Sequence, residues 1–382
     1  MTSIERVLAV LNHEEPDRIP CDLGSTRVTG ITKVAYQKYV EYRGWESGEV
    51  ELDDATQQLI KMPENILTEL GVDIRGLSPK VARTDPMTKE TETDYFFSDE
   101  WGITWKMPKK SGLYFDLYES PLSGEMSEKE IKEYDWPDPT SEEIFRGLSD
   151  RAEEYYNDGF PVILESFGAG IFEMACRLRG YENFYMDLVR QPELACTLMD
   201  ELVELKLRFY EEAADRFGSY IQFIREGDDI AGQEELLISP ESYKNYIKPR
   251  HEKLFSAQKD FFPDPFYVFL HSDGAIYDVL PDFLESGVEV LNPLQVGAKG
   301  VDLEKIKKEF GEDLVLWGGG IDTQNTLPKG TPEEVRREIR KRVKALRSGG
   351  GYIFGAVHNI QGDVPPENIE AMFAEFDEIK YY

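Results

Sequence analysis

The sequence predicts a parallel α/β barrel of eight strands, the (β/α)8 or TIM barrel. Short apolar runs suited to buried parallel strands recur along the chain, and stretches of helical periodicity separate most of them. The runs begin at Ile19, Val72, Pro161, Ile221, Tyr267, Val288, Leu314 and Tyr352. A doubly wound sheet is the alternative, but no GxGxxG sequence follows the first run. We therefore expect residues 1–382 to form a single barrel domain.

The first part of the chain supplies a helix and the first two strands. Ser3 is a suitable cap for the amphipathic stretch SIERVLAVL, and Pro20 leads into the strand IPCDLGS. Helical patterns follow at about residues 30–44 and 54–70. The second strand is then GVDIRGL, with Arg75 near its end.

Residues 81–124 interrupt this alternation and read as hairpins inserted after the second strand. The segment is rich in aromatic residues, which include Trp101 and Trp105, and Gly102 and Gly112 mark turns. One interpretation is an antiparallel flap that packs its rings on the barrel. The other is a lid that lines a substrate site, because aromatic side chains offer rigid apolar area.

Strands and helices alternate strictly from Pro161 onward. A long helical region covers about residues 181–217, and another helix is expected to begin at Pro240, with Ser239 as its cap. The clearest later helices are VDLEKIKKEFG and TPEEVRREIRKRVKALRSGG. The strands between them are YVFLHSD, VEVLNP, LVLWGGGID and YIFGAVH.

Charge and composition exclude several kinds of partner. The chain has 43 Lys and Arg against 74 Asp and Glu, a net charge of −31, which repels nucleic acid, anionic membranes and polyanionic substrates. No signal-like N-terminus, apolar run of membrane-spanning length or CxxC spacing is present. We expect a cytoplasmic protein with a small-molecule substrate, and a homodimer is compatible with the sequence.

Polar side chains stand at the carboxyl ends of six predicted strands, the end where α/β barrels carry their sites. Two of the 4 His of the chain are among them. The strand-end residues are Glu165, Ser166, Arg225, Glu226, Asp228, Asp229, His271, Asp273, Asn292, Asp322, His358 and Asn359.

Two chemistries fit these residues. In the first, His271, Asp273 and His358, with Glu226 as a further candidate, are the ligands of a catalytic zinc. In the second, Glu226 or Asp228 exchanges a proton with His358 without a metal. The residue pattern alone leaves both open. Candidate substrate contacts are Arg75, Trp101, Trp105, Glu165 and Asn292.

Four long stretches resemble the uroporphyrinogen decarboxylase superfamily, and in particular its methyltransferase-like branch, whose members are often found beside corrinoid proteins. They are GDDIAGQEELLISPESYKNYIKPRHEKL, LHSDGAIYDVLPDFLESGVEVLNPLQ, WGGGIDTQNTLPKGTPEEVRREI and GGGYIFGAVHNIQGDVPPENI. The resemblance runs from about Ile4 to the C-terminus. It implies a (β/α)8 barrel, and it implies either decarboxylation or methyl transfer.

The decarboxylases of this superfamily are cofactor-free enzymes that bind a porphyrinogen with many carboxylates. Their arginine-rich MRQAGR-type segment should follow the first strand, where this chain reads CDLGSTRVTGI with Arg27 as the only basic residue. This departure and the charge of −31 argue against a tetrapyrrole substrate. A metal-free carboxy-lyase, with Asp228 and His358 in proton transfer, is the second interpretation.

The methyltransferase-like members hold zinc with an HxC sequence and a later Cys, and they exchange methyl groups with a protein-bound cobalamin. Here His271 matches the His, Asp273 replaces the first Cys, and His358 falls at or near the second. These ligands make the site richer in oxygen, which favours an ether or amine methyl donor over a thiol. The resemblance thus implies a zinc-dependent methyltransferase with a cobalamin-carrying corrinoid partner. A catalytically silent barrel that binds a small molecule or a partner protein is the third interpretation.

Overall fold

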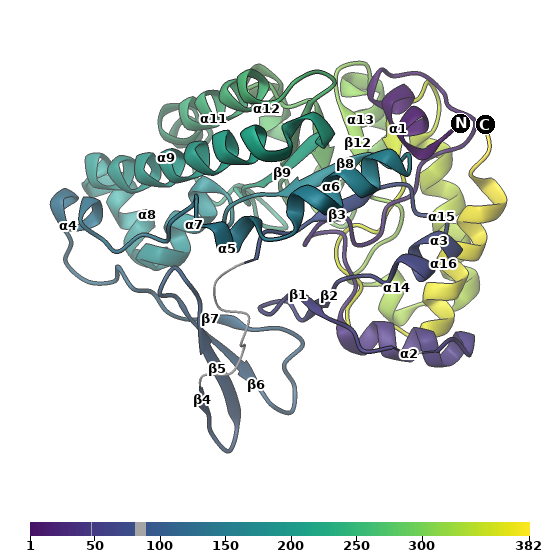
Figure 1. Cartoon of the computed structure of the whole chain (residues 1–382), viewed down its shortest axis with the longest axis horizontal. Helices are drawn as coiled ribbons and strands as arrows, with labels where there is room; N and C mark the ends of the chain where they lie inside the picture. Colours follow the sequence, from purple (N-terminus) through teal and green to yellow (C-terminus); the bar gives the residue numbers. More distant parts are fainter. Residues whose placement is uncertain (47, 81–88) are drawn as a thin grey trace.

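The computed structural model describes residues 1–46, 48–80 and 89–382, and its centre is a curled sheet of seven parallel strands (Figure 1). Neighbours in the sheet follow the order of the chain, which is the topology of a barrel with helical crossovers. The strands are β3 (Arg75–Leu77), β8 (Val162–Glu165), β9 (Phe223–Gly227), β10 (Tyr267–His271), β11 (Val290–Asn292), β12 (Val315–Trp317) and β13 (Tyr352–Ile353).

The first predicted strand closes the ring as an eighth segment between β13 and β3. The Phe354 amide donates to the Pro20 carbonyl over 2.9 Å, and the Asp22 amide donates to the Phe354 carbonyl over 2.8 Å. On the other side the Asp73 amide donates to the Cys21 carbonyl over 2.8 Å. The predicted (β/α)8 barrel is therefore confirmed.

Helices surround the barrel (Figure 1). Helix α15 (Pro332–Leu346) shows why: Thr331 and Glu334 form a capping box, and Val335, Ile339, Val343 and Leu346 form one buried stripe. The others are α2 (Lys33–Arg43), α3 (Glu64–Glu69), α4 (Glu128–Lys132), α5 (Glu142–Phe145), α6 (Leu148–Asn157), α7 (Ile171–Arg179), α8 (Tyr181–Arg190), α9 (Pro192–Phe217), α10 (Pro240–Ser242), α11 (Lys248–Phe261), α12 (Leu280–Glu285), α13 (Leu303–Phe310), α14 (Thr326–Lys329) and α16 (Pro366–Ile379). No helix among the described residues combines the length and the apolar character needed to cross a bilayer.

The interior of the barrel is filled with apolar side chains at its amino-terminal end. Every second strand residue points inward, and helix α1 (Ser3–Leu11) adds Val7, Val10 and Leu11 to the same cluster. The strand residues of this cluster are Ile163, Phe223, Phe269, Val290, Val315, Trp317 and Ile353. Because α1 and these side chains fill this end, a site is left only at the carboxyl ends of the strands.

Two predicted helical regions differ from the structure. Instead of one helix over residues 54–70, β1 (Leu52–Asp54) and β2 (Leu59–Ile60) form an antiparallel ribbon before the short α3. The polar run between these strands has no apolar stripe that a helix could bury. The region 181–217 is two helices, because the chain leaves the helical conformation at Gln191 and Pro192 starts α9.

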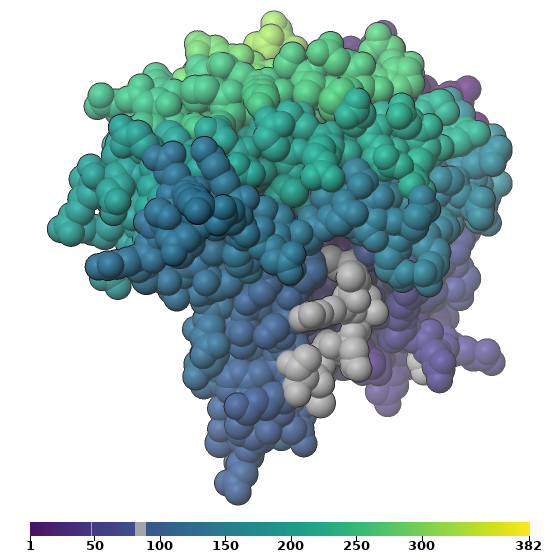
Figure 2. Space-filling view, turned by 60° about the vertical axis from the view of Figure 1, so that its left-hand side comes forward, coloured from purple at the N-terminus to yellow at the C-terminus, as the bar shows by residue number. Residues whose placement is uncertain are grey.

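The predicted insertion is a four-stranded antiparallel sheet that projects from the barrel as a separate lobe (Figures 1 and 2). Residues 81–88 at the start of the predicted segment lie outside the described residues. The strands are β4 (Lys89–Glu90), β5 (Asp94–Ser98), β6 (Thr104–Pro108) and β7 (Asp116–Glu119). Phe97, Trp101, Trp105 and Phe115 are buried, so the sheet packs its rings as the flap interpretation expects.

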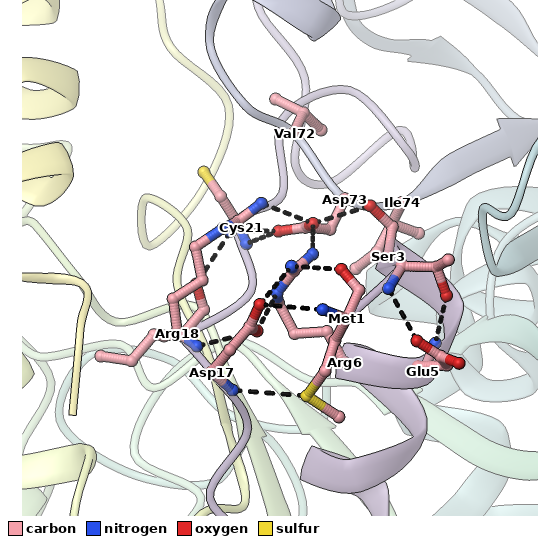
Figure 3. A network of polar contacts seen from close by, with 12 residues as sticks. Met1, Ser3, Glu5, Arg6, Asp17, Arg18, Cys21, Val72, Asp73 and Ile74 are labelled. Atoms are coloured by element: carbon pink, nitrogen blue, oxygen red, sulfur yellow. Dashed lines mark hydrogen bonds and ion pairs between the residues drawn. The ribbon is translucent and has the colours of Figure 1, made fainter.

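A buried carboxylate joins α1, the first strand segment and β3 at the closed end of the barrel (Figure 3). Asp73, with a fully buried side chain, accepts from Arg6 over 2.7 Å, from both terminal nitrogens of Arg18 over 2.7 and 2.9 Å, and from Ser3 over 2.8 Å. The Cys21 amide donates to it over 2.9 Å. Two guanidinium groups and two further donors thus satisfy this carboxylate completely.

Replacing Asp73 with Asn should lower the free energy of unfolding by about 3 kcal/mol, because two largely buried guanidinium groups lose their shared anion. Urea unfolding followed by circular dichroism measures this loss. Asp17→Asn is the control: Asp17 also pairs with Arg6, but its side chain is 42% exposed, so about 1 kcal/mol or less is expected. Equal losses in the two variants would contradict the central role of Asp73.

Candidate active site

Three predicted metal ligands lie together at the open end of the barrel. His271 is the last residue of β10, Asp273 follows two residues later, and His358 lies beyond β13. The Asp273 Oδ2 atom lies 3.9 Å from His271 Nε2 and 3.8 Å from His358 Nε2. One ligand atom from each residue lies within 4.8 Å of the others. We call these three residues the triad.

A neighbouring amide orients His271. The Nδ1 atom of His271 lies 2.7 Å from Asn292 Oδ1, and the Asn292 amide nitrogen donates to the Trp317 carbonyl over 3.1 Å. The Asn292 oxygen is therefore the acceptor, so Nδ1 carries the proton and Nε2 presents a lone pair to the triad. Asn292, expected to contact substrate, is fully buried and instead positions His271 from the adjacent strand β11.

The electrostatics of the triad suit a divalent cation. Desolvation lowers the pKa of both His271 and His358 to about 4, so both imidazoles are neutral at pH 7. Desolvation raises the pKa of Asp273, whose Oδ1 atom is buried without a hydrogen-bond partner among the described residues. Two neutral nitrogens and a carboxylate oxygen match a catalytic zinc with one open position. Tetrahedral zinc places its ligand atoms about 3.4 Å apart, so the separations of 3.9 and 3.8 Å between Asp273 and the two imidazoles need only a small contraction.

Asp229 extends the polar group around the triad. Its Oδ1 atom accepts from the Asp273 amide over 2.9 Å and lies 3.9 Å from His271 Nε2. Desolvation raises its pKa well above the usual range. The sequence placed Asp229 among the strand-end residues, but nothing in the pattern distinguished it from its neighbour Asp228.

The expectation that Glu226 is a metal ligand is wrong. Glu226 points outward from β9 into the helix layer, where it accepts from Lys206 over 3.1 Å and from the hydroxyl of Tyr210. Its neighbour Arg225 points inward instead. The alternation of side chains along a strand therefore separates Glu226 from the triad.

Asp228, the predicted proton-transfer residue, lies behind the site. Its carboxylate accepts from the amides of Phe172 and Glu173 at the start of α7, over 3.0 and 2.8 Å. His251 Nε2 lies 2.9 Å from Asp228 Oδ2, the oxygen that also accepts from the Phe172 amide. Gly170 permits this close packing, since a Cβ there would lie 1.6 Å from the Gly227 carbonyl oxygen. Asp228 therefore anchors α7 to β9 and does not line the cavity.

Two predicted substrate contacts are also structural. Arg75 points away from the barrel interior and pairs through Nε with Glu64 over 2.9 and 3.0 Å. Glu165 is buried and holds Arg225, whose Nη2 and Nε atoms lie 2.6 and 3.0 Å from its carboxylate. The Arg27 amide also donates to Glu165, over 2.6 Å. Neither Arg75 nor Glu165 lines the cavity.

A cavity of about 550 Å³ lies over the triad, between the barrel and the inserted sheet. His271, Asp273 and His358 form part of its lining, and Trp101 and Trp105 form part of the opposing, inserted wall. Both tryptophans are also packed: the Trp105 Nε1 atom donates to Asp99 over 2.8 Å, and Trp101 lies against Phe167 with ring centroids 5.1 Å apart. The inserted sheet thus packs its rings, as the flap interpretation expects, and also lines the cavity, as the lid interpretation expects.

Sequence reasoning did not identify several residues that line this cavity. Asp53 and Asp54 lie on β1 of the ribbon, where a helix was expected from about residue 54 onward, and Asp99 and Glu100 come from the turn of the inserted sheet. Glu173 is the remaining carboxylate, at the start of α7. None of the five lies at the end of a barrel strand, since two are on β1, two in a turn and one at the start of α7, so the pattern of barrel strands could not place them.

The fold and the site define a (β/α)8 barrel with a candidate metal centre at the carboxyl ends of its strands. Residues 100–379 match the uroporphyrinogen decarboxylase (URO-D) family, so the chain belongs to that family. It is 23% identical over 273 residues to a methylated-thiol–coenzyme M methyltransferase of Methanosarcina mazei, a match that covers 70% of this chain and 65% of the relative.

Further relatives agree with this membership. A uroporphyrinogen decarboxylase of Syntrophotalea carbinolica is 25% identical over 217 residues, which cover 54% of this chain and 57% of that enzyme. The structure of a methyltransferase from Methanosarcina mazei superposes with a TM-score of 0.66 at 17% identity and covers 99% of both chains. The likeness in structure supports the barrel fold. The expected resemblance to the methyltransferase-like branch is confirmed as a similarity in sequence.

Replacing Glu226 with Gln should lower the free energy of unfolding by about 3 kcal/mol, because the buried ammonium of Lys206 loses its anion. Urea titration measures the change. The double variant Glu226→Leu with Lys206→Met removes both charges and should recover most of the lost stability. If Glu226→Gln changed stability by less than about 1 kcal/mol, the outward assignment of Glu226 would be contradicted.

Proposed function

We propose that this protein is a zinc-dependent methyltransferase that moves a methyl group from a small ether or amine to a corrinoid protein. The observation that carries this proposal is the triad. Asn292 fixes the tautomer of His271, so that the lone pair of His271 Nε2 faces the space shared with Asp273 and His358. A hydrogen bond of this kind behind a histidine is typical of metal ligands. The similarity to a methyltransferase of Methanosarcina mazei supports the same reaction class.

His271, Asp273 and His358 would hold the metal. When bound there, zinc would supply a Lewis acid that polarises the oxygen or nitrogen from which the methyl group departs. Two imidazoles and one carboxylate form a harder ligand set than thiolates do, which suits an oxygen or nitrogen donor.

The remaining residues of the chain orient the substrate and exclude water. The inserted sheet covers the triad with Trp101 and Trp105, so the methylated heteroatom reacts in a partly enclosed space. The methyl group leaves this heteroatom for the corrinoid, and the heteroatom keeps the bonding electron pair and takes up a proton. The open end of the barrel is where the partner would approach.

A metal-free carboxy-lyase receives less support. Its expected proton-transfer pair, Asp228 and His358, is not assembled, because Asp228 is committed to the start of α7 and to His251. A silent barrel that only binds a small molecule keeps the cavity but gives no reason for the oriented triad.

The protein should bind about one zinc per chain after loading and desalting, as measured by inductively coupled plasma mass spectrometry. Asp273→Ala and His358→Ala should each lose most of this metal. His13→Ala is the matched control, because His13 lies outside the triad, next to the Gly311 carbonyl, and this variant should bind zinc normally. Wild-type protein that holds no zinc after loading would refute the metal site.

His358→Ala and His358→Gln should both lower methyl transfer to cob(I)alamin by at least about 100-fold. Gln keeps a polar side chain but neither titrates nor replaces imidazole as a zinc ligand. The loss of cob(I)alamin absorbance, with aryl methyl ethers and methylated amines as donors, measures turnover, and circular dichroism checks the fold. An active Gln variant would remove His358 from the reaction.

A further inference from the structure

The cavity over the triad has an excess of negative charge. Among the described residues that line it, seven have carboxylates, three have guanidinium groups and none is a lysine. Each guanidinium already has an acidic partner. Arg27 lies 3.6 Å from Asp53 and 3.9 Å from Asp54, Arg177 pairs with Glu173, and Arg225 pairs with the buried Glu165. A negatively charged ligand would have to compete with these carboxylates for every cation in the cavity.

Glu100 stands out among the carboxylates of the inserted wall. The carboxylate of its neighbour Asp99 already has three donors within the same sheet. It accepts from the Trp101 and Ile103 amides over 3.0 and 2.9 Å and from the Trp105 ring nitrogen over 2.8 Å. No direct hydrogen bond or ion pair joins the Glu100 side chain to another described residue, and the Arg27 guanidinium attracts it only at longer range. Desolvation accordingly raises the pKa of Glu100 to about 7.

The wall beside Glu100 is aromatic, and the sheet that forms it already attracts cations. The Arg177 guanidinium lies 5.4 Å from the ring centroid of Trp105, and the Lys106 ammonium lies 5.5 Å from that of Tyr118. Aromatic rings bind cations through the negative charge on their faces. A carboxylate that has no direct partner among the described residues and lies next to such rings is a recognition surface for a positively charged amine.

We propose that the methyl donor is a cation: a protonated or alkylated amine whose positive charge lies against Glu100 and the aromatic wall, with its methylated heteroatom at the triad. The position of the methyl group rests on the proposed function. The positive charge of the ligand is inferred from the carboxylates and aromatic rings of the cavity. A bound cation would pair directly with Glu100 and offset the desolvation of its carboxylate.

Three probes that share one skeleton and differ in charge test this inference: 4-methoxybenzylamine, 4-methoxybenzyl alcohol and 4-methoxybenzoate. Isothermal titration calorimetry on the wild-type protein without zinc, where no metal can bind the amine or the carboxylate of a probe, should show that the amine binds about tenfold more tightly than the alcohol. The benzoate should bind more weakly than either, because the field of the cavity repels it.

Glu100→Gln should reduce the preference for the amine over the alcohol to about threefold or less while the alcohol binds as before. Glu119→Gln is the matched control, because Glu119 is an exposed carboxylate on β7 of the same sheet and does not line the cavity. It should leave the preference unchanged. Equal melting temperatures of the two variants exclude a folding defect.

Two results would overturn the inference: an amine that binds no more tightly than the alcohol, or a benzoate that binds most tightly of the three. Because the readout is binding, it does not depend on methyl transfer. A protein that prefers the amine but never methylates cob(I)alamin would refute the proposed function and leave the cationic ligand standing. Methyl transfer from a neutral ether, with no preference for the amine, would support the proposed function and refute the cationic ligand.

Discussion

The alternation of side chains along parallel strands is the constraint on which this structure depends. A shift of one residue moves a side chain from the barrel interior to the helix layer. On β9 this rule sends Arg225 into the cavity and its neighbour Glu226 to Lys206. On β10 and β11 it brings His271 and Asn292 side by side, so that one histidine is both exposed to the cavity and held from behind.

The barrel and the triad could be predicted from the sequence because each leaves a strong local signal. Apolar runs mark the strands, and His271, Asp273 and His358 come directly after such runs, where all strand ends meet. Glu226 could not be placed from the sequence, because its neighbour Arg225 is also charged and the pattern does not show which of these two residues points inward. Asp228 was misjudged for another reason: its partners are the amides of α7 and His251, which are far away in the sequence.

The two halves of the site come from different layers of the fold. The barrel contributes the triad, whose geometry is fixed by buried strands, and the inserted sheet contributes the aromatic and acidic wall, whose residues lie in a turn and on short strands. In a (β/α)8 barrel the strands keep the geometry of the site constant while the inserted loops and sheets vary. The ligand set and the charge of the wall are thus independent features, and each can change without loss of the other.

The filled amino-terminal end of the barrel determines from which side a ligand can reach the cavity. Helix α1 and the inward apolar side chains close this end, and the hydrogen bonds of Asp73 hold α1 in place. The cavity is therefore closed at the amino-terminal end of the barrel and lies at the carboxyl ends of the strands. If the proposed corrinoid partner docks over the carboxyl ends of the strands, it would cover the face from which a small molecule enters, so the donor would bind before the partner and the demethylated product would leave after it.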